Sequence, residues 1–143
     1  MPSHDMSAKT EAVLGVASQT LTGSSTSAAI DTRNFGELLV IATVGTATIT
    51  PSTANKFTVL VKESSSSAGT YTGVSATNII GGVSGSTIGA IIAIDTTAKP
   101  SNVYTASVLN TKRWIRVGAT ESGTAALRIG IAVLGGRLNY APQ

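Results

Sequence analysis

The sequence predicts an all-β fold: one antiparallel β-sandwich or jelly roll of about eight strands, with extended arms at both ends. Short apolar runs with period-two alternation recur along the chain, turn residues separate them, and no convincing amphipathic helix is present. The 143 residues suit one domain that buries roughly 70% of its unfolded surface. Apolar residues make up 42% of the chain and fall in patterned runs, which argues against disorder.

The clearest strand is FTVLVKE at Phe57–Glu63, whose first, third and fifth residues alternate with a threonine, a leucine and a lysine. The polar loop SSSSAG follows it. This loop has no catalytic side chain to offer, so we interpret it as a hydrated, outward-facing tip. The other expected strands are Gln19–Leu21, Ser27–Ile30, Glu37–Thr50, Tyr71–Val74, Thr87–Ile94, Val103–Leu109, Arg113–Ala119 and Ala125–Leu134.

Turn residues set the expected connections between these strands. Gly45 lies in the middle of Glu37–Thr50 and predicts a bulge or a sharp bend there, and Pro51 ends this strand because proline cannot continue a sheet ladder. The short link PSTANK predicts antiparallel pairing between Glu37–Thr50 and Phe57–Glu63. Two further expectations are a hairpin of Val103–Leu109 with Arg113–Ala119 and, as an alternative to extended chain, a short helix over Thr10–Leu14.

The chain has no internal linker, and we divide it into an N-terminal arm (residues 1–12), a β-sandwich domain (13–136) and a C-terminal tail (137–143). The arm and the tail are polar and have little to bury, so we expect a neighbouring subunit or a partner to order them. Each fully buried aliphatic residue of the core contributes about 1.5 to 3 kcal/mol. The expected core residues are Leu38, Val40, Ala42, Val44, Phe57, Val59, Val61, Leu127, Ile129, Ile131 and Val133.

The chain has few residues for catalysis or metal binding. His4 is the only histidine, and Ser3 and Asp5 cannot form a relay with it because adjacent side chains point apart, so we interpret His4 as a solvated or contact-making residue. With one histidine and no cysteine, a single chain lacks the ligands of common zinc, iron and copper sites. The seven carboxylates are scattered over turns and strand ends. We therefore expect no enzyme activity and no cofactor.

Two segments invite a ligand-binding interpretation. The glycine-rich Gly81–Gly89 lacks the lysine of a Walker motif and no helix follows it, so a flexible turn is the better interpretation. In KRWIRV, alternation places Lys112, Trp114 and Arg116 on one face. Trp114 is either packed on the sheet edge under arginine stems, an anchor of a protein interface, or a stacking platform for a sugar or a single-stranded nucleic acid. The tyrosines available to such a platform are Tyr71, Tyr104 and Tyr140.

The net charge of +3 comes from ten basic and seven acidic residues scattered along the chain. This is a mild bias and not the clustered footprint of a nucleic-acid-binding protein. The N-terminal MPSHDMSAKTEA lacks the apolar core of a secretory signal, and the longest apolar runs are far shorter than the ~20 residues of a membrane helix. We expect a product made in the cytoplasm, with no nucleic-acid or membrane partner.

The order FGELLVIATVG, FTVLVKESSSSAGTY, KRWIRV and a final hydrophobic strand ending in Gly-Gly resembles the small cement, or decoration, proteins of tailed-phage heads. The likeness covers roughly Gln19–Gly136 as a pattern of strands and turns. Its most specific parts are the strand-to-loop unit that begins at Val61 and the K-R-aromatic-x-R-V strand. The N-terminal arm and the Gly81–Gly89 loop carry no signature of the family.

The resemblance implies a jelly-roll or β-sandwich virion protein on the outer surface of an icosahedral capsid. It would bridge adjacent subunits of the major capsid protein, pair with copies of itself (a dimer before a trimer), and stabilise the shell against packaged DNA. It would be made in the host cytoplasm without a signal peptide and take no small-molecule substrate. A carbohydrate-binding module of a phage tail or fibre is the main alternative, and a self-assembling minor coat or tail-tube subunit is a third. The expected interface residues are His4, Lys9, Trp114, Arg116, Arg137 and Tyr140.

Overall fold

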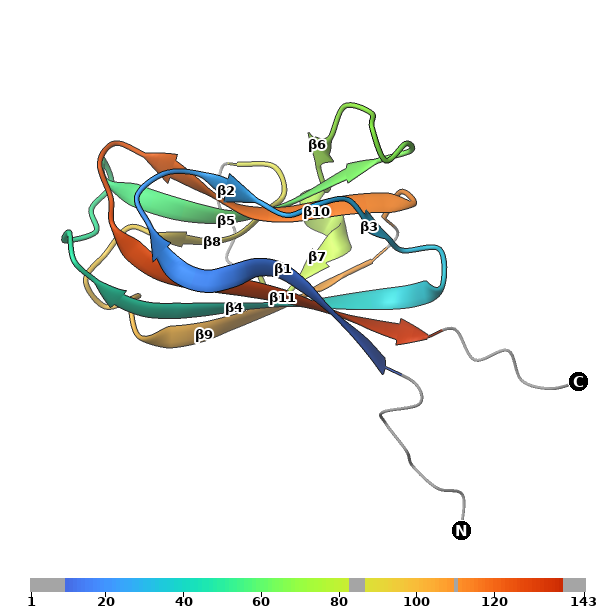
Figure 1. The fold of residues 1–143 in the computed structure, drawn as a ribbon, viewed down its shortest axis with the longest axis horizontal. Helices are drawn as coiled ribbons and strands as arrows, with labels where there is room; N and C mark the ends of the chain where they lie inside the picture. The colour runs from blue at the N-terminus through green and yellow to red at the C-terminus, as the bar shows by residue number, and fades with distance from the viewer. Residues whose placement is uncertain (1–9, 83–86, 110, 138–143) are drawn as a thin grey trace, which may run out of the picture.

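The computed structural model describes residues 10–82, 87–109 and 111–137, and for Arg137 the backbone alone. In Figure 1 the chain forms two stacked β-sheets, the antiparallel sandwich that the sequence predicts. The described residues form eleven strands instead of about eight, because several are two-residue pieces that pair with the longer strands. One 3-10 turn, η2 at Ala76–Asn78, adds the helical part of the described chain.

Sheet A contains β1 (Thr10–Leu21), β4 (Phe35–Ala47), β7 (Ile79–Ile80), β9 (Asn102–Val108) and β11 (Leu127–Arg137). Its order is β1-β11-β4-β9-β7, with every pairing antiparallel. The first and last strands are neighbours, and Thr10 is paired with Gly136. The two ends of the described chain therefore leave the sandwich at one corner, at the lower right of Figure 1.

Sheet B contains β2 (Ser25–Thr26), β3 (Ile30–Asp31), β5 (Lys56–Ser64), β6 (Thr72–Gly73), β8 (Ala90–Ile94) and β10 (Trp114–Ser122). β5 and β10 form its centre and pair antiparallel along their whole length, from Trp114↔Ser64 to Ser122↔Lys56. β2 and β3 pair with the other edge of β10, and β6 and β8 with the other edge of β5.

The core lies between the two sheets, and the predicted core residues are confirmed. All eleven predicted core residues are at most 4% exposed. Sheet B adds the inward residues of β8 and β10, among them Ile91, Ile94, Ile115 and Val117, which are at most 1% exposed. Alternation on β10 thus turns Ile115 and Val117 inward and leaves Trp114 and Arg116 on the outer face of the sheet.

Three expectations from the sequence are wrong, one about secondary structure and two about strand pairing. Thr10–Leu14 is not a helix but the start of β1, so Thr10–Ala12 of the predicted arm already belong to sheet A. β4 and β5 do not pair, and β9 and β10 do not form a hairpin, because each pair is split between the two sheets. A link of a few residues can cross the ~10 Å between packed sheets as readily as it can close a hairpin. The inward apolar faces of both strands are buried in either case.

Two glycine positions fit the fold as the sequence suggests. The register of β4 on β11 moves from Ala47↔Leu127 to Val44↔Ile129, which confirms a bulge at Gly45. Gly135 explains the Gly-Gly end of the last strand, because a Cβ atom there would lie 2.3 Å from Cδ1 of Phe35. The Phe35 ring occupies that space and packs against the core.

Candidate interaction surfaces

The outer face of sheet A is apolar. Among the described residues, three of the exposed large hydrophobic side chains lie on it: Leu14 is 69% exposed, Val103 63% and Ile80 57%. Half-buried aliphatic residues of β4 and β11 fill the space between them. No other strand lies below sheet A in Figure 1. We call the set Ala12, Leu14, Leu39, Ile41, Ile80, Val103, Ala132 and Leu134 the apolar face.

The outward residues of β4 form a stripe across this face, which we call the β4 stripe, and a charged residue lies at each of its ends. Alternation places Glu37, Leu39, Ile41, Thr43 and Gly45 on the outer side of β4. Glu37 is exposed at one end. At the other end the side chain of Arg128 lies over Gly45, since its Cβ is 3.0 Å from where a Gly45 Cβ would be. The stripe thus runs from an acid through an aliphatic middle centred on Ile41 to a base.

The outer face of sheet B carries the basic and aromatic residues that the sequence singles out. Trp114 and Arg116 are both half-buried on β10. The guanidinium of Arg113 lies 5.1 Å from the centre of the Trp114 ring, and that of Arg116 lies 4.4 Å from the centre of the Tyr71 ring. The exposed Lys62 is the cross-strand partner of Arg116. We call Lys62, Tyr71, Arg113, Trp114 and Arg116 the basic face.

The SSSSAG loop holds Tyr71 in place. Its hydroxyl donates a hydrogen bond to the carbonyl oxygen of Ser67, at 3.0 Å. Within the loop the Gly69 N–H donates to the Ser66 carbonyl at 3.2 Å, and the Ser66 N–H donates to Oγ of the buried Ser64 at 3.3 Å. The loop is therefore a folded support for one wall of the basic face, and not only the hydrated tip that the sequence suggests.

An ion-pair cluster joins β3 to the start of β10. Asp31 accepts two hydrogen bonds from the Arg113 side chain, at 3.3 Å from Nε and 3.1 Å from Nη2. The Arg33 backbone N–H and Nε also donate to it, at 3.1 and 2.8 Å. These contacts, the Arg113 hydrogen bonds first, lower the pKa of Asp31 to about 2. The same pairing raises the pKa of Arg113.

Replacing Asp31 by asparagine is expected to remove a pH-dependent part of the stability. Because the pKa of Asp31 is lowered on folding, from 3.8 to about 2, its charge stabilises the fold above the unfolded pKa. That contribution is lost as the pH falls through the folded pKa. Asp31→Asn should therefore be less stable than the wild type near pH 7, with the difference shrinking toward about pH 2.

Urea unfolding midpoints across this pH range test that expectation. Arg113→Gln should reproduce part of the pH-dependent loss, because Arg33 also pairs with Asp31, at 2.7 Å. Added to Asp31→Asn, Arg113→Gln should change the stability little further, because its partner is already removed. A constant difference between wild type and Asp31→Asn from pH 7 to about pH 2 would show that the charge of Asp31 does not act through this pair.

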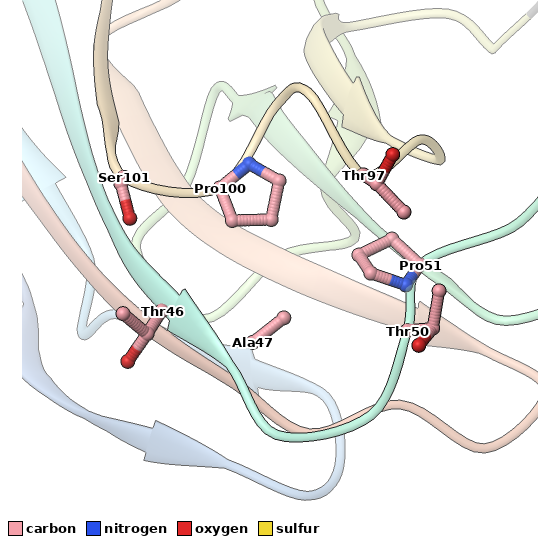
Figure 2. Close-up of a pocket in the computed structure, with 7 residues that line it drawn as sticks. All are labelled: Thr46, Ala47, Thr50, Pro51, Thr97, Pro100 and Ser101. Carbon is pink, nitrogen blue, oxygen red and sulfur yellow. The ribbon is translucent and has the colours of Figure 1, made fainter.

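A pocket lies between the end of β4 and the turn before β9. Figure 2 shows its lining residues, Thr46, Ala47, Thr50, Pro51, Thr97, Pro100 and Ser101. Their polar side chains are hydroxyls alone, with no general acid, base or charged ligand among them. Ser101 has a φ of 61° and its N–H donates to the Gly45 carbonyl at 3.0 Å, which fixes this turn on the bulge of β4. We interpret the pocket as a structural junction.

The structure brings together part of the predicted interface set. Trp114 and Arg116 share the basic face, and Tyr71 and Lys62 join them there. Arg137 is the last described residue, paired with Phe35 at the end of β11, and its side chain is not described. His4, Lys9 and Tyr140 lie outside the described residues. Sequence reasoning missed the apolar face together with its end residues Glu37 and Arg128.

Within the described parts of the chain, no group of three or more histidine, cysteine, aspartate or glutamate side chains is placed to hold a metal ion. No helix there has the length and apolar character to cross a membrane. The surfaces that the structure does build are two extended faces of opposite chemistry, one aliphatic and one cationic. No protein-family model matches the chain, and no curated protein matches it.

Proposed function

We propose that this protein is a structural virion protein that decorates the outer surface of an icosahedral phage capsid and cements adjacent subunits of the major capsid protein. In this proposal the apolar face of sheet A joins two copies of the protein. The basic face of sheet B lies on the opposite layer, so such a dimer presents its two basic faces in opposite directions and binds the capsid through one of them. The phage assignment rests on the sequence resemblance to cement proteins, and the two faces support an assembly role.

The observation that carries the proposal is the apolar face. An antiparallel sheet that ends at solvent normally has polar residues on its outer side. Here Leu39, Ile41 and Leu134 are half-buried on that side, beside the exposed Leu14 and Val103. Large contiguous apolar patches on soluble proteins mark interaction sites. A rigid sandwich with such a face is suited to assembly with another protein surface.

The ends of the β4 stripe favour a second copy as the occupant of this face. A two-fold axis that runs across the strands near Ile41 would reverse the stripe in the partner. Glu37 of each copy would then lie opposite Arg128 of the other, with aliphatic residues against aliphatic residues between them. A two-fold interface needs a self-complementary patch of this kind. Opposite charges at the rim also fix the register of association.

The size of the face suits a stable dimer. The four long strands β1, β11, β4 and β9, spaced ~4.8 Å apart, give a width of about 19 Å, and the β4 stripe from Glu37 to Gly45 is about 27 Å long. The corresponding area is about 500 Å² per copy, so two copies bury about 1,000 Å², the size at which specific protein interfaces begin.

The aromatic contacts weigh against the carbohydrate-binding alternative. A sugar ring or a base needs a free aromatic face on which to stack. One face of the Trp114 ring is covered by Arg113, and one face of the Tyr71 ring by Arg116. The cations thus cover one face of each ring and leave fewer stacking faces for a sugar, which favours a protein surface as the partner of the basic face.

Binding to phage heads tests the function. Purified protein is mixed with heads that lack it, and the bound copies are counted after sedimentation. We expect saturable binding in a fixed ratio to the major capsid protein, and bound heads that resist heat and DNA pressure better than bare heads. Absence of saturable binding, together with specific hits on a glycan array, would contradict the proposal and support a tail or fibre module.

A further inference from the structure

We propose that Lys62 and Arg116 form a binding site for a carboxylate on an acidic protein surface, the anchor by which the basic face holds its partner. The inference deepens the proposed function and rests on it for the identity of the natural partner. The site itself is argued from the contacts of sheet B. Its direct test uses a defined acidic peptide, so the site and the function can fail independently.

The two cations lie side by side, and no acidic residue of the described chain is paired with either of them. Arg116 on β10 is directly opposite Lys62 on β5, so their side chains project from the same face. The ion pairs among described residues involve Arg33, Lys99 and Arg113, and neither Lys62 nor Arg116. Like charges directly opposite each other in a sheet are destabilising. An incoming anion would remove that repulsion and gain from both charges.

The Arg116 side chain is preorganised for binding. Its guanidinium is stacked 4.4 Å from the centre of the Tyr71 ring, and the Tyr71 hydroxyl is fixed to the Ser67 carbonyl at 3.0 Å. The stack restricts a side chain that otherwise has much rotamer freedom, so binding loses less entropy. The serine-rich loop before Tyr71 is thereby given a role, as the support of this arginine.

A small dent bordered by both cations completes the site. It is bordered by Thr26, Leu60, Lys62, Arg116, Gly118 and Thr120, and it has room for about one water-sized atom. Nε of Arg116 is buried and has no hydrogen-bond acceptor among the described residues. A single carboxylate oxygen matches both the size of the dent and its charge.

A protein carboxylate fits this site better than a nucleic acid does. Phosphate backbones are bound by tracks of several cations. Here Arg113 is already paired with Asp31 at 3.1 Å, which leaves two cations without a carboxylate partner at the centre of the face. An arginine already covers one face of each aromatic ring that would stack on a base. Two convergent cations with one small dent suit one side-chain carboxylate.

The fluorescence of Trp114 reports on the site, because it is the only tryptophan of the chain and its backbone is two residues from Arg116. The full-length protein is titrated with a short, end-blocked oligoglutamate peptide, with inorganic phosphate and with an oligothymidylate of matched charge. We expect a saturable change with oligoglutamate. Arg116→Gln and Lys62→Gln should each weaken its binding about tenfold or more. Tyr71→Leu should weaken it less, because both charges remain.

Lys56→Gln is the matched control. Lys56 is on the same strand and the same face as Lys62, at the other end of the β5–β10 pairing, and its substitution changes the net charge equally. It should bind oligoglutamate like the wild type, and urea unfolding should show all variants folded. Equal weakening by Lys56→Gln would reveal only general charge attraction and overturn the site. Tighter, Arg116-dependent binding of oligothymidylate would overturn the choice of a carboxylate.

The same variants separate the site from the function. Heads that bind Arg116→Gln as well as the wild type would overturn this anchor and leave the capsid proposal standing. Oligoglutamate binding that depends on Arg116, with no binding to heads, would support the carboxylate site and contradict the capsid proposal.

Discussion

Replacing Ile41 by lysine is expected to turn the proposed dimer into a monomer while the fold stays intact. Ile41 is half-buried on the outer side of β4, midway between Glu37 and Gly45. The two-fold axis would bring both copies of the new lysine together in an apolar interface, where unpaired like charges cost several kcal/mol. Since each ~1.4 kcal/mol is a factor of ten, the dissociation constant of the dimer should rise by at least about 100-fold.

Sedimentation velocity over a range of protein concentrations measures this change. Thr22→Lys is the control, because Thr22 is exposed in the turn between β1 and β2 and the substitution adds the same charge away from the apolar face. Thr22→Lys should remain a dimer. Urea unfolding at concentrations where both proteins are monomeric should show Ile41→Lys close to the wild type, since its side chain points out of the core. A dimeric Ile41→Lys would rule out this face.

Reversing one charge at the end of the stripe should have the second-largest effect on the dimer. Glu37→Arg would place two bases together at both ends of the two-fold interface, and Arg128→Glu would place two acids there. Each change should weaken the dimer by about tenfold or more, and added salt should reduce the effect because the pairs lie at the rim. The double variant, which exchanges the two charges, should recover most of the lost affinity.

Much of the sandwich could be predicted from the sequence, because apolar residues recur at alternate positions of its long strands and face the core. The residues Phe57, Val59 and Val61 occupy every second position of a strand and are fully buried. The bulge at Gly45 was also predictable, since a glycine inside a strand weakens the ladder locally. Local pattern and burial agree in these elements.

The pairing of the strands could not be predicted, because the turn residues between β4 and β5, or between β9 and β10, serve a hairpin and a crossover equally well. What decides between them is how the inward faces of all the strands pack together, which no local window contains. The extended conformation at the start of β1 could not be predicted for a related reason. Thr10–Leu14 has no strong alternation, and its extended form depends on pairing with β11.

The apolar face left a signal in the sequence that alternation alone does not use. FGELLVIATVG has aliphatic residues at successive positions, so inward Leu38 and Val40 are interleaved with outward Leu39 and Ile41. A continuous apolar run is typical of a strand covered on both faces. The inner face is covered by sheet B. The other face requires a cover that the described chain does not supply.

The basic face could be predicted only in part. The segment KRWIRV places Trp114 and Arg116 together on one side, as alternation requires. Lys62 and Tyr71 are distant in sequence and reach Arg116 through the β5–β10 pairing and the folded serine-rich loop. Neither contact follows from spacing along the chain.

The proposed dimer requires that a second copy of the protein covers the apolar face, with its own β4 stripe running in the opposite direction. Sedimentation equilibrium of four proteins tests it most directly: the wild type, Glu37→Arg, Arg128→Glu and the double variant. We expect twice the 14.4 kDa chain mass for the wild type, weaker dimers for both single variants, and recovery of the dimer affinity in the double variant. A monomeric wild type, or a double variant at least as weak as the two single effects combined, would contradict it.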